Sequence, residues 1–85
     1  MAESWCVYVL QSSRNGRLYT GSTNDLDRRL GEHTSGRSPY TRGAGPFELR
    51  YTEPCEDRLA ARRRERYLKS GRGREELKAL LASAG

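Results

Sequence analysis

The stretch "YVLQSSRNGRLYTGS", residues 8–22, decides how the fold of this chain begins. It contains two short runs rich in β-branched and aromatic residues, and Asn15-Gly16 lies between them. An Asn-Gly pair between two such runs is the strongest short-range signal for a β-hairpin. We therefore predict a hairpin with strands at residues 5–10 and 17–21, each of which carries a tyrosine.

The register of this hairpin decides whether its two tyrosines, Tyr8 and Tyr19, share a face of the sheet. If Asn15 and Gly16 are the two turn residues, Tyr19 lies opposite Ser12, and the side chains at alternate positions share one face. Tyr8 and Tyr19 then point the same way. A loop two residues longer preserves this result because only the parity matters, whereas a one-residue bulge would reverse it. At this stage both tyrosines could equally be ordinary sheet aromatics.

A short helix is predicted over residues 24–34, with Ser, Thr and Asn as candidate N-caps. One of its faces carries a stripe with spacings of four and three residues: Leu26, Leu30 and His33. At 100° per residue Arg29 lies beside this stripe, while Arg28 lies almost opposite and faces solvent. His33 on such a stripe is either a catalytic group or a hydrogen-bonded residue at the edge of the core.

The rest of the chain predicts a loop, a third strand and two helices. Residues 35–46 are rich in Gly and Pro and form the loop. Residues 47–53 alternate in polarity, so we expect one buried face with Phe47, Leu49 and Tyr51. A helix over residues 56–70 should stop at Gly71, and a shorter helix over 74–82 should have Leu77, Leu80 and Leu81 as its inner face. With 85 residues, the chain is expected to form one small domain.

The composition is strongly basic, with a formal net charge of +5, and fourteen of its sixteen basic residues are Arg. Such a chain attracts polyanions, and Arg in particular binds phosphate through two hydrogen bonds. The Arg bias could equally reflect genomic codon usage. The run "RRRERY" at 62–67 is likewise either a phosphate-binding patch or a solvated helix face.

Cysteine usage and hydropathy exclude several classes of protein. Cys6 and Cys55 form no Cys-x-x-Cys motif, which argues against a disulfide framework and a zinc site. The N-terminus lacks the basic region and apolar run of a signal peptide, and no stretch approaches the length of a membrane span. We expect a cytoplasmic protein with no membrane association.

Glu65 is the most informative single residue of the sequence. Together with Ala61 and Leu68 it falls at helical spacing, which places its carboxylate within an otherwise apolar stripe. An inward carboxylate needs a metal ion, an Arg or several donors, because leaving it unpaired costs several kcal/mol. The plainer interpretation is an ion pair with Arg62 or Arg58 on the flank of the same helix.

Several of these residues together match a known family. The chain has "VY" at 7–8, "YTG" at 19–21, an Arg ten residues after the second tyrosine, a His four residues later, and a Glu on a later helix before "LK". The segments "HTSG", "YTRG" and "ERYLKSGRGREELK" extend the match over almost the whole chain. The sequence resembles the GIY-YIG nuclease superfamily, and within it the small stand-alone proteins that consist of little more than the nuclease domain.

This resemblance implies an α+β fold, a three-stranded antiparallel sheet flanked by three to four helices, and a metal-dependent DNA endonuclease. Its catalytic residues would be Tyr8 and Tyr19 as the motif tyrosines, Arg29 on the scissile phosphate and His33. Glu65 would be the ligand of Mg²⁺ or Mn²⁺, which need only one carboxylate and several waters. We expect further contacts with the nucleic acid at four residues: Gly21, Ser22, Arg42 and Lys69. Gly21, without a Cβ, would let the substrate backbone approach the second strand.

The sequence departs from the family pattern at several positions. Cys6 stands where the first motif has glycine, Thr20 where the second has isoleucine, and Ser22 where some relatives have lysine. The late asparagine of some members is absent. No catalytic residue type is lost. The sequence leaves open which tyrosine is the general base, which DNA or RNA structure is cut, the pathway and the oligomeric state.

Three functions follow from these observations. The first is an endonuclease that is selective for DNA structure and acts in repair or recombination. Because so short a chain has few residues available to contact bases, a protein partner could supply specificity. The second is a catalytically inactive DNA-binding module of the same fold, and the third is a protein-interaction scaffold.

Overall fold

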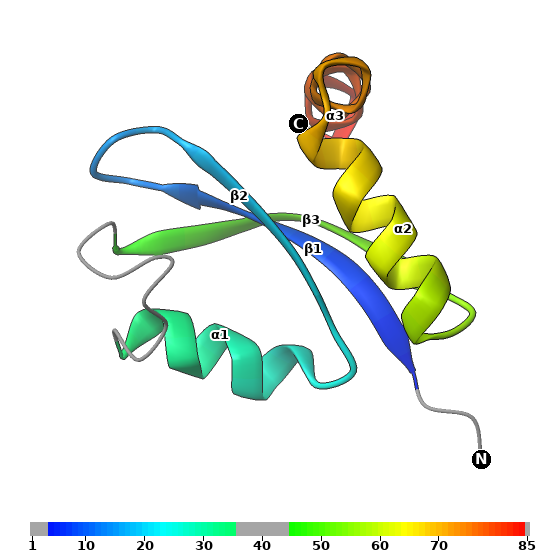
Figure 1. The fold of residues 1–85 in the computed structure, drawn as a ribbon. Coiled ribbons are helices and arrows are strands. Elements are labelled where there is room, and N and C mark those ends of the chain that lie inside the picture. Colours follow the sequence, from blue (N-terminus) through cyan, green and yellow to red (C-terminus); the bar gives the residue numbers. More distant parts are fainter. Residues whose placement is uncertain (1–3, 36–44, 85) are drawn as a thin grey trace.

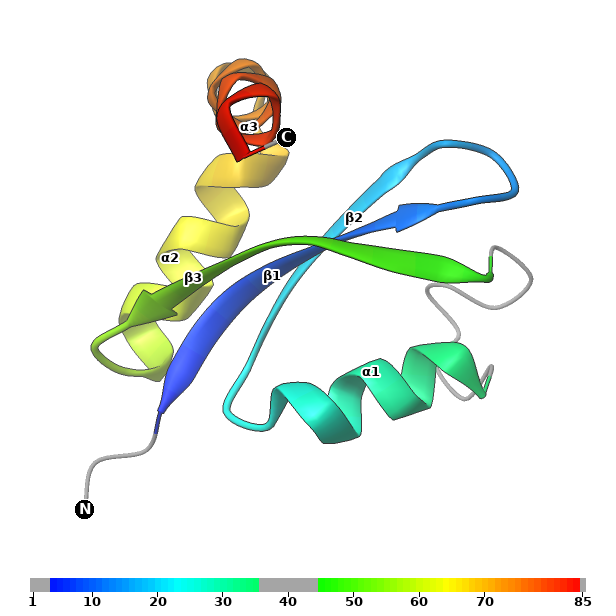
Figure 2. The same ribbon diagram turned by 180° about the vertical axis from the view of Figure 1, so that it is seen from behind.

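The structure is a computed structural model that describes residues 4–35 and 45–84. Its sheet has three antiparallel strands in the order β2-β1-β3, and three helices accompany it. Helix α1 lies on one side of the curved sheet, and α2 lies on the other and leads into α3 (Figure 1). The view from behind shows the same two sides (Figure 2). The predicted fold class is therefore confirmed.

The predicted hairpin joins strands β1 (Trp5–Ser12) and β2 (Leu18–Thr23). Its register differs from the prediction: Tyr19 pairs with Leu10, not with Ser12. The backbone N–H of Ser12 donates to the Arg17 carbonyl at 3.0 Å, so the loop spans residues 13–16 and is two residues longer than predicted. The parity is unchanged, and Tyr8 and Tyr19 lie on the same face as Leu10.

Side chains within the loop explain its extra length. The Ser12 hydroxyl accepts hydrogen bonds from the backbone N–H groups of Arg14 and Asn15 at 3.1 and 3.2 Å. Asn15 Oδ1 accepts one from the backbone N–H of Arg17 at 2.8 Å. Such side-chain bonds compete with the strand ladder and stabilise the wider loop, in which Gly16 adopts a φ of 74°.

Strand β3 (Phe47–Cys55) pairs with β1 along the edge opposite β2. Its register shifts in the middle, because Val9 pairs with Tyr51 while the next residue, Leu10, pairs with Leu49. One residue of β3 is therefore extra at this point, and Leu49 and Tyr51 lie on opposite faces. The predicted shared buried face is wrong, and Leu49 is 41% exposed.

Aspartates set the beginnings of helices α1 (Leu26–Thr34) and α2 (Arg58–Lys69). The Asp25 side chain accepts from the Arg28 backbone N–H at 3.1 Å, and Asp57 does the same for Ala60 at 2.8 Å. Asp25, rather than the predicted Ser, Thr or Asn, is thus the N-cap of α1.

The third helix, α3 (Gly71–Ala84), is longer than predicted. Gly71 was expected to stop the preceding helix, but it is the first residue of α3. The break comes at Ser70, whose backbone is extended with ψ of 167°. Its hydroxyl accepts from the Gly73 backbone N–H at 3.2 Å and so satisfies one of the first donors of α3.

The hydrophobic core fills the space between the sheet and α2 and α3. Its buried residues are Val7, Val9, Ala61, Leu68 and Leu77, and the partly buried residues against it are Trp5, Leu18, Tyr51, Cys55 and Leu81. The opposite face of β1 carries Tyr8 and Leu10, which are also buried. Side chains from β1 therefore support both sides of the sheet, as expected for its central strand.

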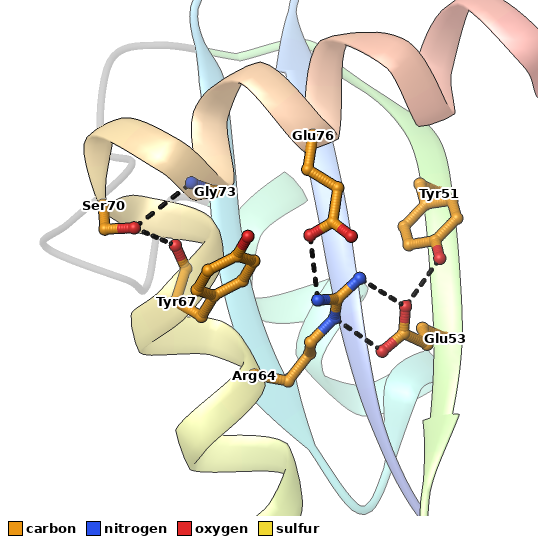
Figure 3. A network of polar contacts seen from close by, with 7 residues as sticks. All are labelled: Tyr51, Glu53, Arg64, Tyr67, Ser70, Gly73 and Glu76. Carbon is orange, nitrogen blue, oxygen red and sulfur yellow. Dashed lines mark hydrogen bonds and ion pairs between the residues drawn. The ribbon is translucent and has the colours of Figure 1, made fainter.

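A polar cluster, here called the Arg64 cluster, ties α2 to β3 and α3 and consists of Arg64, Glu53, Glu76 and Tyr51 (Figure 3). Arg64 donates to both carboxylate oxygens of Glu53, at 2.8 and 3.2 Å, and to Glu76 at 3.0 Å. The Tyr51 hydroxyl donates to Glu53 at 2.7 Å. The Tyr67 ring lies 5.5 Å from the Arg64 guanidinium. Arg64 thus belongs to the scaffold, although its sequence run suggested a solvated face or a phosphate-binding patch.

Both cysteines, Cys6 and Cys55, are free thiols. Among the helices that the structure describes, none has the length and apolar character needed to cross a membrane.

Candidate active site

A hollow of about 230 Å³ lies at the β2 edge of the sheet. Its lining from the sheet consists of Tyr8, Tyr19, Thr20, Gly21 and Ser22, and its lining from the helices consists of Arg29, His33, Arg62, Glu65 and Lys69. The edge position explains this mixture, because side chains from α1 and from α2, on opposite faces, can meet where the sheet ends. All the predicted site residues that the structure describes therefore gather here, and Arg42 lies outside the described residues.

Tyr8 reaches this edge from the central strand by crossing over Gly21. A Cβ atom at Gly21 would lie 2.4 Å from the Tyr8 hydroxyl oxygen and 2.6 Å from Cζ of the same ring. Only a residue without a side chain leaves room for this ring. The space beside Gly21, which we expected to admit the substrate backbone, is thus occupied by Tyr8.

Tyr8 and His33 form a hydrogen-bonded pair, with 3.0 Å between the hydroxyl oxygen and Nε2. Burial raises the pKa of Tyr8 to about 12, and the opposing effect of the Arg29 charge is smaller. Burial also lowers the pKa of His33, and the Arg29 charge adds to that effect. At neutral pH the phenol is therefore protonated and the imidazole neutral, and in the His33 tautomer that carries its proton on Nδ1 the Tyr8 O–H donates to Nε2.

Arg29 lies in the hollow and Arg28 is exposed, as the helical spacing predicted. The Arg29 Nε is buried and forms an ion pair with Oε1 of Glu32 at 3.6 Å, too long for a hydrogen bond, and neither atom has a hydrogen-bond partner among the described residues. A buried N–H without an acceptor is costly. An anion that entered the hollow would supply the missing acceptor.

Tyr19, the second motif tyrosine, lines the same hollow. Its hydroxyl oxygen accepts a hydrogen bond from the side-chain amide nitrogen of Asn15 at 3.4 Å. Its ring packs edge-on against Phe47, with 5.6 Å between the ring centroids. Tyr19 is thus held by the hairpin loop and by β3, whereas Tyr8 is held by His33.

Glu65 receives two hydrogen bonds, from the Ser22 hydroxyl to Oε1 at 2.6 Å and from Lys69 Nζ to Oε2 at 2.8 Å. Burial acts to raise the pKa of Glu65, but these two bonds, together with the charges of Lys69 and Arg62, outweigh it and hold the pKa below its usual value. The carboxylate is therefore charged at neutral pH. Its ion-pair partner is Lys69, one turn further along α2, and not Arg62 or Arg58.

The residues present fit a hard divalent cation held by one carboxylate. Within residues 4–35 and 45–84, no three His, Cys, Asp or Glu side chains come together as a metal site. A cation that keeps most of its waters needs no such cage, and the Glu65 carboxylate is ionised and borders a hollow with room for water. Glu65 would be the protein ligand of such a cation.

Arg62 lines the hollow as well, although from the sequence we predicted for it only an ion pair with Glu65 or a place in the basic run at 62–67. Its charge helps to lower the pKa of Glu65. Its place in the site could have been predicted from the spacing, because Arg62 lies three residues before Glu65 and therefore on the same side of α2.

The chain matches the family model described as the GIY-YIG catalytic domain over residues 4–78. A UPF0213 protein of Natronomonas pharaonis is 45% identical over 71 residues, which are 82% of each chain. A UPF0213 protein of Desulfotalea psychrophila is 43% identical over 68 residues, which are 78% of this chain and 61% of that relative.

A solved structure shows the same fold. The solution NMR structure of the UPF0213 protein BH0048 from Bacillus halodurans is 41% identical to this chain. The superposition has a TM-score of 0.57 and covers 91% of this chain and 84% of that one.

Proposed function

This chain belongs to the GIY-YIG family, a family of nucleases, and we propose that it is a divalent-metal-dependent endonuclease that hydrolyses phosphodiester bonds in DNA. One observation carries the proposal. The β2 edge brings a tyrosine–histidine pair, an arginine with an unsatisfied N–H and an ionised carboxylate into one hollow of about 230 Å³. These groups supply a proton acceptor, a phosphate-binding group and a metal ligand.

Arg29 binds the scissile phosphate in this mechanism. The phosphate would give the buried Nε an acceptor, and the guanidinium would neutralise charge on the non-bridging oxygens. Glu32, 3.6 Å away on the next turn of α1, helps to orient the guanidinium.

The Tyr8–His33 pair receives the proton of the attacking water. A phenol with a pKa near 12 is a poor base at neutral pH if it acts alone. Neutral His33, 3.0 Å away, can take the Tyr8 proton as Tyr8 accepts one from water. Tyr8, rather than Tyr19, is thus the tyrosine that we assign to proton transfer.

Glu65 would hold the cation, which when bound would lower the pKa of water and stabilise charge on the phosphate. Mg²⁺ and Mn²⁺ are the candidates, because both accept a coordination shell made largely of water. Lys69, now paired with Glu65, and the nearby Ser22 would border the bound nucleic acid.

We further propose that the enzyme selects its substrate by DNA structure and acts in repair or recombination in the cytoplasm. One small domain would carry out this activity. The net charge of +5 supports contacts with phosphates of any sequence. A protein partner would then supply further specificity.

Cleavage of labelled duplex, flap and four-way-junction DNA with Mg²⁺ or Mn²⁺ tests the proposal, with wild type compared to Glu65→Ala. Circular dichroism checks that both preparations are equally folded. Cleavage that disappears in the variant supports a metal-dependent nuclease. If both proteins bind DNA and neither cuts any substrate with either metal, the chain is a DNA-binding module instead.

A further inference from the structure

A second and larger hollow, here called the β2–α3 groove, continues from the candidate active site. It has a volume of about 560 Å³ and lies between the start of β2 and α3. Tyr19, Thr20 and Lys69 line both hollows, so the two are neighbours on the surface. A ligand that leaves the active site in this direction enters the groove.

The rim of the groove is basic. Four cationic side chains line it, and none of its lining residues is a carboxylate: the four are Arg17, Lys69, Arg74 and Lys78. Arg74 and Lys78 are four residues apart on α3 and thus share one face of this helix. Lys78 forms an ion pair with Glu75 at 3.5 Å, and both side chains are more than two-thirds exposed. Such a pair is weak and is readily exchanged for a phosphate.

The floor of the groove is apolar and consists of Leu18, Leu68 and Leu77. Leu68 and Leu77 belong to the core and are 1% and 3% exposed, so the apolar surface that a ligand can touch comes mainly from the partly exposed Leu18. A row of cations above an apolar floor suits a strand whose phosphates face the rim and whose sugars or unpaired bases face the floor. In a duplex the bases are stacked inside the helix and would not reach this floor.

We propose that the β2–α3 groove binds the backbone of a single DNA strand that runs away from the scissile phosphate. This inference rests on the proposed function, because the strand enters from the nuclease site. It assigns phosphate contacts to Arg17, Arg74 and Lys78, for which the family resemblance implies no catalytic or metal-binding role. A substrate with an unpaired arm next to the cleavage site would use both hollows.

Fluorescence anisotropy of a labelled 15-nucleotide single strand, in EDTA and over a range of salt concentrations, tests the groove without cleavage. The groove variant is Arg74→Ala with Lys78→Ala. The matched control, Arg63→Ala with Arg72→Ala, removes the same two charges at exposed positions of α2 and α3 that line neither hollow. Circular dichroism checks the folding of both.

The groove variant should bind the strand roughly tenfold more weakly at about 0.1 M salt, and the control within about twofold of wild type. The slope of log K against log salt should become smaller by about 1.4 in the groove variant, as expected for two lost single-strand phosphate contacts. A duplex of equal length should lose less affinity than the single strand.

Equal losses in the two double variants would overturn the proposal, since net charge alone would then explain binding. It would also fail if wild type does not bind the strand, or if a duplex shows the same loss. The nuclease proposal is judged separately, by cleavage of flap DNA with Mn²⁺. If wild type cuts flap DNA but the groove variant binds the single strand normally, only the groove proposal is refuted. If binding depends on the groove but wild type cuts no substrate, only the nuclease proposal is refuted.

Discussion

Two carboxylates, Glu53 on β3 and Glu65 on α2, are buried to a similar extent but have different surroundings. The side chains of Glu53 and Glu65 are 26% and 19% exposed, and each pairs at 2.8 Å with a cation from α2. Glu53 is enclosed by Arg64 and Tyr51 within the Arg64 cluster (Figure 3). Glu65 borders a hollow of about 230 Å³. A partly buried, paired carboxylate therefore indicates function only where space for a ligand adjoins it.

The same contrast separates neighbours in the sequence. Arg64 and Glu65 are adjacent, but one helical step of 100° directs Arg64 to β3 and α3 and Glu65 to the edge of β2. Residues of one basic run thus contribute to the scaffold and to the candidate site. The following variants separate these two contributions.

Of these variants, Arg29→Ala should have the largest effect, a loss of roughly 10²- to 10³-fold in the rate of flap DNA cleavage with Mn²⁺. The reason is the loss of the group assigned to the scissile phosphate. Arg28→Ala, one residue earlier and exposed, removes the same charge and should cut at nearly the wild-type rate. Similar losses in the two variants would contradict a specific contact of Arg29 with the scissile phosphate and would attribute its effect to the positive charge alone.

Arg64→Met should lower the free energy of unfolding by about 2 kcal/mol, because it leaves Glu53 without its main donors. The expected fall in Tm is about 10 °C for a chain of this size. Thermal unfolding followed by circular dichroism measures it. Cleavage by the folded variant should be near that of wild type, and a rate as low as that of Arg29→Ala would place the Arg64 cluster within the active site.

Gly21→Ala should reduce cleavage about tenfold, because its Cβ would displace the Tyr8 hydroxyl from His33. Steady-state rates on flap DNA provide the test. Gly31→Ala is the control, since a Cβ there meets no other atom within 4 Å, and in helix α1 it should be neutral or slightly stabilising. An unchanged rate in Gly21→Ala would show that the Tyr8–His33 contact is dispensable.

The pH dependence is the smallest expected effect. Cleavage should decline as the pH falls through the pKa of His33, which burial places below 6.5, because protonated imidazole cannot accept the Tyr8 proton. Rates measured from about pH 5 to pH 8 should show this acidic limb in wild type, and it should be absent from the residual activity of His33→Gln. A limb that persists in His33→Gln belongs to another group.

The sequence predicted the elements better than their details. The hairpin, α1 and the inner positions of Leu77 and Leu81 in the last helix follow from residue patterns, whereas the predicted Leu80 is not among the core residues. The spacing of the motif residues is what identified the family. The loop register did not follow, because it depends on hydrogen bonds of Ser12 and Asn15 side chains. The irregularity in β3 was also hidden, since Phe47, Leu49 and Tyr51 alternate as in a regular strand.

Partner choice within the site was equally beyond the sequence. Helical spacing offered Glu65 several cations, and only the packing of α2 against β2 brings Ser22 to one of its oxygens and leaves Lys69 on the other. The reason for Gly21 likewise emerges in three dimensions, because the ring beside it comes from a different strand.

The most direct test compares Glu65→Gln with Glu53→Gln, with cleavage of flap DNA and Tm measured on the same preparations. Glu65→Gln should lose cleavage roughly 10³-fold with a Tm within about 3 °C of wild type. Glu53→Gln should lower the Tm by about 5 to 10 °C and leave cleavage by the folded protein within about twofold. Wild-type cleavage by Glu65→Gln, or the same loss in both variants, would contradict the division between site and scaffold.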